Sequence, residues 1–204
     1  IAIPSFVGFL VLANPILALL FNGNIDISAN MLRLGAITVV FYCMSTVTNA
    51  ILQGLNKMTT PVKHGAISLC IHLAGLFIML VIFKMGIYAV VASNIIFSLS
   101  MCILNARALK REAAYHQEVE KTFLIPAVAA VVMGVVALVI YFLCNLVMSQ
   151  NIAVIIALLV AVVVYGVSLL KFGGLSQEEI LALPKGSTLL SLFQKLHLVK
   201  EEYA

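Results

Sequence analysis

Charged residues are scarce in this sequence. Lys, Arg, Asp and Glu make up 10% of the chain, whereas hydrophobic residues make up 63%. Soluble domains typically contain about 25% charged and about 45–50% apolar residues. A soluble core cannot bury this excess of apolar surface, but a lipid bilayer accommodates it. We therefore expect the net charge of +4 to lie on loops beside anionic lipid headgroups, and not on a nucleic-acid-binding surface.

The long apolar runs contain no acidic residue, because all eight lie in loops or in the C-terminal tail. Carboxylates inside a membrane usually mark proton relays or ion sites. Glycosyl transfer or hydrolysis normally needs carboxylates near the reacting bond. The sequence also lacks a P-loop, a Gly-rich nucleotide turn, an HExxH motif and a nucleophile elbow. It therefore predicts a protein that is not an enzyme and indicates no cofactor.

The cysteines give no sign of a metal or redox site, because each lies singly within an apolar run. We interpret them as apolar packing residues. The first residue is Ile and no basic segment follows it, so we expect the chain to be a piece of a longer protein. The four cysteines are Cys43, Cys70, Cys102 and Cys144.

Six apolar runs are each close to the roughly 20 residues that a membrane-spanning helix needs. The last two runs consist almost entirely of Ala, Val, Leu and Ile, so we expect these helices to face lipid or other helices. The sequence thus predicts an all-α, polytopic membrane protein. The predicted spans are residues 2–21, 31–53, 62–83, 87–105, 123–147 and 152–171.

A polar break at residues 51–64 sets the orientation of these spans. Gly54 is expected to end one helix, and the hydroxyls of Thr59 and Thr60 are expected to cap the next. Ten Lys and Arg residues fall in this break, in residues 106–122 and in the stretch from Lys171 onward, against Arg33 and Lys84 on the opposite side. Because basic residues favour the cytoplasmic side, both ends of the chain are predicted to be cytoplasmic.

These patterns divide the chain into four segments. Residues 1–105 hold four spans, 106–122 form a charged cytoplasmic loop, 123–171 hold two peripheral spans, and 172–204 form a cytoplasmic tail. A capping-box pattern, with Ser176 three residues before Glu179, predicts a short helix at the start of the tail. A second, amphipathic helix is predicted to lie on the membrane surface. Its apolar face is formed by Leu189, Leu192, Phe193 and Leu196.

Two prolines, Pro4 and Pro15, lie in the first span. Proline removes a backbone donor and tends to kink a helix, which neighbouring helices in a membrane tolerate. We interpret both positions as helix kinks. The kinks serve either packing alone or a bend that is used during alternating access.

Polar residues recur every three or four positions in the second, third and fourth spans, so each set shares one helix face. Such stripes either hold helices together through small and hydrogen-bonding side chains, or line a shared hydrated cavity. His72 lies near the middle of its span, where a titratable group is costly unless it is paired. It either bonds to a neighbouring helix or takes part in pH-dependent coupling. The candidate substrate-path residues are Thr38, Tyr42, Ser45, Asn49, Gln53, Ser68, His72, Asn94 and Ser98.

Four motifs occur in order along the chain: PILALLF, ILQGLNKMTTPV, KMGIYAVVASNI and YGVSLLKFGGLSQEEILALPKG. With them the chain resembles the C-terminal part of the polysaccharide transporter and stage V sporulation protein B family. That family belongs to the superfamily of multidrug, oligosaccharidyl-lipid and polysaccharide exporters, which includes lipid II flippases. Its members have two six-helix lobes followed by two further helices. The resemblance implies that the first four spans belong to the second lobe of such a flippase fold and that the last two are the extra helices.

The resemblance also implies a function: transport of a lipid-linked oligosaccharide across the bacterial cytoplasmic membrane by alternating access. The substrate would be an undecaprenyl-pyrophosphate-linked sugar or a lipid II-like precursor of the cell wall. The polar stripes would line a cavity for the sugar headgroup, and the two apolar spans would form a groove for the polyprenyl tail. The expected partners are the bilayer, the polyprenyl-linked sugar and a missing N-terminal lobe of the same chain.

Two other functions stay open at this point. One is a multidrug or cation antiporter of the same superfamily, which would need an intramembrane carboxylate outside this stretch. The other is a non-transporting membrane scaffold for cell-wall or spore-coat assembly. A scaffold predicts that the polar stripes are buried in helix contacts, whereas a transporter predicts that water reaches them.

Overall fold

The structure is a computed structural model that describes residues 1–113, 120–174 and 180–181. Every regular element in these residues is a helix, and six of the helices are long and apolar enough to cross a membrane. The predicted all-helical architecture with six potential spans is therefore confirmed. The chain divides into two compact units, residues 1–117 and 118–204, and each is described by itself.

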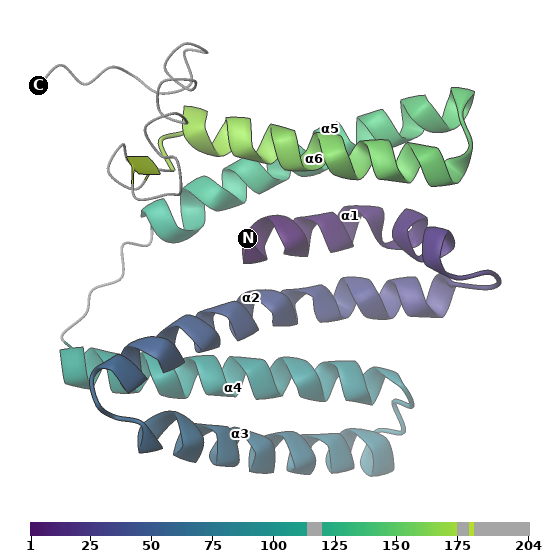
Figure 1. Ribbon diagram of the computed structural model, residues 1–204. Coiled ribbons are helices and arrows are strands. Elements are labelled where there is room, and N and C mark those ends of the chain that lie inside the picture. The colour runs from purple at the N-terminus through teal and green to yellow at the C-terminus, as the bar shows by residue number, and fades with distance from the viewer. Residues whose placement is uncertain (114–119, 175–179, 182–204) are drawn as a thin grey trace, which may run out of the picture. The chain divides into compact units, whose positions relative to one another are not determined.

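Unit 1 consists of four long helices (Figure 1). Helix α2 packs against both α1 and α4, and α4 also packs against α3, so α4 lies between α2 and α3. Direct contact between α2 and α3 is limited. A π-helical turn, η1 (Ile78–Ile82), continues α3. The four helices are α1 (Ala2–Leu20), α2 (Asp26–Gly54), α3 (Thr59–Phe77) and α4 (Tyr88–Ala113).

A short connection, residues 55–58, joins α2 to α3. Helix α2 ends at Gly54 as predicted, and Asn56 takes the left-handed backbone conformation with φ 62°. Neither Thr59 nor Thr60 caps α3, which has no side-chain cap, so that prediction is wrong. The turn itself supplies the acceptor, because the Thr60 amide donates to the carbonyl oxygen of Lys57 at 3.1 Å. A threonine hydroxyl is therefore not needed there.

Helix α4 runs further than the hydropathy pattern predicts. Residues 106–113, expected in a loop, are helical and continue α4 to Ala113. Hydropathy indicates where a span leaves the membrane, but a helix continues while its residues favour helical geometry. The sequence ARALKREA contains strong helix formers, and Leu109 within it is buried. Lys110 and Arg111 lie in the last turn, where positive charge interacts favourably with the helix dipole.

Unit 2 contains a hairpin of two apolar helices, α5 (Ile125–Val147) and α6 (Gln150–Lys171), preceded by a π-helical turn, η2 (Glu120–Leu124). The residues buried in this hairpin are mainly small, and three alanines of α6 recur every four residues. Small residues let helix backbones approach closely, which is how helices associate in a membrane without a hydrophobic driving force. The buried residues include Ala129, Ala130, Gly134 and Ala137 of α5, and Ala153, Ala157 and Ala161 of α6.

The outer surfaces of this hairpin are apolar, with exposed Val135, Val139, Leu159 and Val162 among many similar residues. Such a surface suits contact with lipid. Of the short helix predicted at the start of the tail, the structure describes Ile180 and Leu181, which are helical. Its capping box and the whole of the amphipathic helix lie outside the described residues.

Candidate functional site: polar groups between α2, α3 and α4

A hydrogen-bonded network of polar side chains joins three helices of unit 1. Asn105 of α4 is fully buried, and its Nδ2 donates to Oδ1 of Asn49 on α2 at 2.7 Å. The same Nδ2 lies 3.4 Å from the carbonyl oxygen of Ser45. The Asn105 Oδ1 lies 2.8 Å from Nδ1 of His64 on α3. Because an amide oxygen only accepts, His64 donates from Nδ1. We call these residues the Asn105 network.

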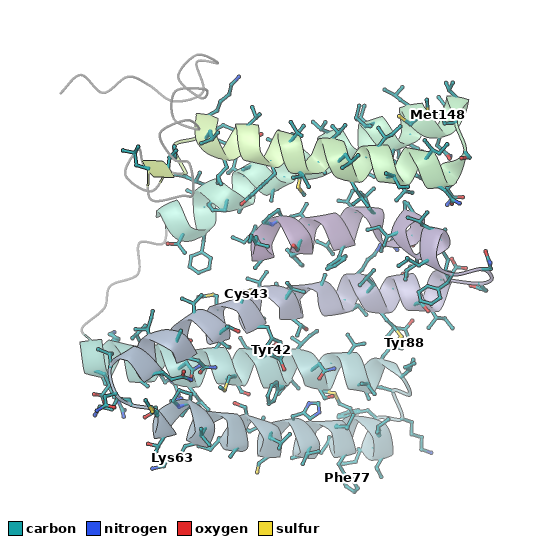
Figure 2. All side chains as sticks on the ribbon, viewed as in Figure 1. Tyr42, Cys43, Lys63, Phe77, Tyr88 and Met148 are labelled. Atoms are coloured by element: carbon teal, nitrogen blue, oxygen red, sulfur yellow. The ribbon has the colours of Figure 1, made fainter. Side chains whose placement is uncertain are left out.

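An ion pair lies toward the same end of unit 1. Nζ of Lys57, in the connection between α2 and α3, lies 3.1 Å from Oε2 of Glu112 in the last turn of α4. Both side chains are more than a third exposed, so water screens their attraction. Figure 2 labels Lys63 at this end of α3, whereas Phe77 lies at the opposite end. We call the end that carries Lys57 and Lys63 the basic end.

Further from the basic end, aromatic rings from the same three helices meet. The ring centroid of Phe97 on α4 lies 6.0 Å from that of Tyr42 on α2 and 5.9 Å from that of His72 on α3. Figure 2 shows Tyr42 pointing from α2 toward α4. His72 Nδ1 lies 3.0 Å from the carbonyl oxygen of Ser93, so this nitrogen also carries its proton. We call Tyr42, Phe97 and His72 the three-ring cluster.

Several polar groups next to the three-ring cluster have no hydrogen-bond partner within the described part of unit 1. Thr38 Oγ1 is buried and unpaired. The Asn94 side chain is exposed and makes no hydrogen bond there, and the Tyr42 side chain is 49% exposed. Polar groups without partners are costly in a membrane. They therefore require water, another helix or a ligand.

The unpaired groups of α2 and α4 lie at the same level. Two pairs of neighbouring residues show that the helices run in the same direction. A Cβ added at Gly35 would lie 3.5 Å from Val91, and Asn49 pairs with Asn105. The residue numbers differ by 56 in both pairs, as they do only when two helices are parallel. This register places Thr38 level with Asn94. The α2–α4 contact thus changes along its length, from paired amides near the basic end to unpaired polar groups further along.

The other predicted substrate-path residues fall into two groups. Ser45, Ser68 and Ser98 are buried in unit 1. The hydroxyls of Ser45 and Ser98 donate to carbonyl oxygens of their own helices, at 2.9 and 3.0 Å. Gln53, in contrast, is exposed in the last turn of α2. The structure thus divides the polar stripes between helix contacts and an exposed face.

The two prolines of α1 lie in different settings. Pro4 occupies the first turn, where no backbone donor is required, whereas Pro15 lies inside the helix. The helical geometry breaks at Leu12, with φ −106° and ψ 18°. A proline ring clashes with the carbonyl four residues earlier, which accounts for a break just before Pro15. The bend therefore belongs to Pro15.

Three residues that organise this region are not among the predicted substrate-path residues. Asn105 and Phe97 lie on or next to the polar stripe of α4, so their helical spacing was the available signal. The second span was predicted to begin at residue 31, which would put Arg33 at its end. Because α2 begins at Asp26, Arg33 instead lies two turns inside the helix, half-buried against α1.

The described residues contain no group of three or more His, Cys, Asp and Glu side chains that could hold a metal ion. Comparison with known proteins adds no assignment. No protein-family model, curated protein or solved structure matches this chain. The family membership therefore stays a prediction from the sequence motifs. The six apolar helices are those of a multi-pass membrane protein.

Proposed function

We propose that this chain forms part of a transporter that moves lipid-linked oligosaccharides across the bacterial cytoplasmic membrane by alternating access. The observation that carries the proposal is the set of polar groups without partners beside the three-ring cluster. Thr38, Tyr42 and Asn94 lie within helices that are otherwise apolar enough to cross a membrane. A hydrated sugar path gives these groups the partners that lipid cannot.

The chemistry of these side chains suits a sugar. Ligand sites combine an apolar or aromatic lining with a few placed polar groups that fix orientation. Here the amide of Asn94 both donates and accepts, and the hydroxyls of Thr38 and Tyr42 do the same. The rings of Tyr42 and Phe97 supply an apolar surface nearby. A sugar needs both kinds of contact, hydrogen bonds for its hydroxyls and apolar surface for its C–H groups.

The remaining features are consistent with the proposal. The exposed apolar surface of the α5–α6 hairpin provides a face on which a polyprenyl chain can lie. In this proposal the basic end of unit 1 faces the cytoplasm, as the distribution of Lys and Arg favours. The motif resemblance to polysaccharide exporters supplies the substrate class, which the side chains alone do not specify.

A membrane scaffold is the second candidate, because the Asn105 network is the type of contact that a scaffold predicts. Asn49, His64 and Asn105 pair with one another between helices. Transport and scaffolding differ in what they require of the unpaired groups. A scaffold would cover Tyr42 and Asn94, which are exposed in unit 1, with another helix, whereas a transporter leaves them accessible to water and substrate.

The proposal is tested by transport measurements on single substitutions. Thr38→Val and Asn94→Leu each remove hydrogen-bonding groups that have no partner in unit 1, so we expect both to slow translocation of a lipid-linked sugar. Thr46→Val is the matched control, because the Thr46 hydroxyl is exposed but donates to the carbonyl oxygen of Tyr42 in its own helix at 2.9 Å. If Thr38→Val and Asn94→Leu transport as fast as Thr46→Val, these residues are not in the path.

A further inference from the structure

Arg33 is held in one orientation beside the bend of α1. Its Nε donates to the carbonyl oxygen of Leu10 at 3.2 Å, and its Nη1 donates to Oδ1 of Asn30 at 3.3 Å. The break in helical geometry at Leu12 lies two residues after Leu10. The bond to Leu10 joins α1 to α2 close to the break. The guanidinium is thus anchored by its neighbours.

Neither partner of Arg33 neutralises its charge. A backbone carbonyl and an asparagine amide are both neutral groups, and the ion pair within the described residues joins Lys57 to Glu112 instead. A guanidinium has five N–H donors, and the two bonds of Arg33 leave three of them without a partner among the residues that the structure describes. A cation in a spanning helix is costly unless a negative group compensates it.

The depth of Arg33 indicates where that negative group lies. Helix α2 has 29 residues, so at a rise of about 1.5 Å per residue it is about 43 Å long. It thus exceeds the bilayer hydrocarbon core of about 30 Å by roughly 13 Å in total. Arg33 lies about 10 Å from the start of the helix at Asp26, so it lies toward the Asp26 side of the membrane. Its bond to Asn30, one turn nearer Asp26, directs the side chain toward the Asp26 end of the helix.

We propose that Arg33 binds the phosphate group of a membrane lipid at the Asp26 end of α2. The free N–H groups of Nη1 and Nη2 form the planar fork that pairs with two phosphate oxygens at once. The bonds to Leu10 and Asn30 fix this fork in advance, so little side-chain freedom is lost on binding. The site is independent of the proposed transport function, since phosphate is common to phospholipids and polyprenyl-linked sugars.

The test measures lipid retention by the full chain in micelles, using native mass spectrometry. The probes are phosphatidylglycerol and a diacylglycerol with the same acyl chains but no phosphate. We expect Arg33→Gln to weaken phosphatidylglycerol binding about tenfold and to leave diacylglycerol binding unchanged. Lys84→Gln is the matched control, because Lys84 is an exposed cation in the connection between η1 and α4. It removes the same charge without an anchored guanidinium, and we expect it to change binding by less than about twofold.

Arg33→Lys keeps the test decisive if Arg33→Gln fails to fold. Lysine preserves the charge but lacks the planar fork, so we expect weaker phosphatidylglycerol binding with an unchanged unfolding temperature. Unchanged binding in both variants, or equal losses in Arg33→Gln and Lys84→Gln, would overturn the proposal. Undecaprenyl phosphate added as a competitor identifies the source. If undecaprenyl phosphate displaces phosphatidylglycerol from the wild type but not from Arg33→Gln, the site accepts polyprenyl phosphates. If undecaprenyl phosphate displaces no phosphatidylglycerol from either protein, the ligand is a phospholipid.

Discussion

Replacing Asn105 with leucine tests the contribution of the buried network to the stability of unit 1. Leucine has the same side-chain branching at Cγ but cannot hydrogen-bond, so Asn49 Oδ1 loses a donor and His64 Nδ1 loses its acceptor. Hydrogen bonds between membrane helices average about 0.6 kcal/mol and reach about 1.7 kcal/mol. Two short bonds and one of 3.4 Å are lost. We therefore expect the free energy of unfolding to fall by about 1–3 kcal/mol.

The assay is a titration of the purified chain with sodium dodecyl sulfate, followed by circular dichroism. Asn94→Leu is the matched control, because it makes the same change on the same helix at an exposed position without a partner. We expect it to alter the free energy of unfolding by no more than about 0.5 kcal/mol. Asn49→Leu should not add fully to Asn105→Leu, since the two residues share a bond. The reasoning is refuted if Asn105→Leu is as stable as the wild type, or if Asn94→Leu costs as much.

Two further substitutions test the packing of unit 2 and the ion pair of unit 1. Ala157→Leu places a large side chain at a fully buried position of α6, so we expect the free energy of unfolding to fall by about 1–3 kcal/mol in the same titration. Val162→Leu is the control, because Val162 is 73% exposed and its replacement should be nearly neutral. Equal losses in the two variants would contradict this packing. Lys57→Gln removes a partly exposed ion pair, so we expect less than about 1 kcal/mol. This small loss should shrink further in high salt, and a loss that is large or independent of salt would show that the pair is more important than its exposure indicates.

The sequence was sufficient to predict the helices because membrane spans depend on a simple physical requirement. About 20 apolar residues must cover the hydrocarbon core, and every run that satisfies this became a helix. Helix ends were less predictable. α4 continues to Ala113 through charged residues, since helical geometry does not require apolar side chains outside the membrane. The expected cap by Thr59 or Thr60 is absent, because the carbonyl oxygen of Lys57 in the preceding turn accepts from the Thr60 amide instead.

The candidate site was only partly predictable for a different reason. Helical spacing shows that Asn49, Asn94 and Asn105 belong to polar stripes, but not which neighbour each side chain meets. The neighbour of each side chain depends on how α4 packs between α2 and α3. This packing pairs Asn49 with Asn105 and leaves Asn94 exposed. The role of Arg33 was hidden for a similar reason. Its contact with Leu10 joins two helices and depends on the bend in α1.

The most direct test of the proposed function is a translocation assay in proteoliposomes that contain the native gene product. A fluorescent undecaprenyl-pyrophosphate-linked sugar is the probe, and its loss from one leaflet is followed over time. We expect the wild type to translocate it faster than protein-free vesicles, and Asn94→Leu to be about tenfold slower, which corresponds to about 1.4 kcal/mol. A wild-type rate equal to that of protein-free vesicles, or an Asn94→Leu rate equal to the wild type, would contradict the account.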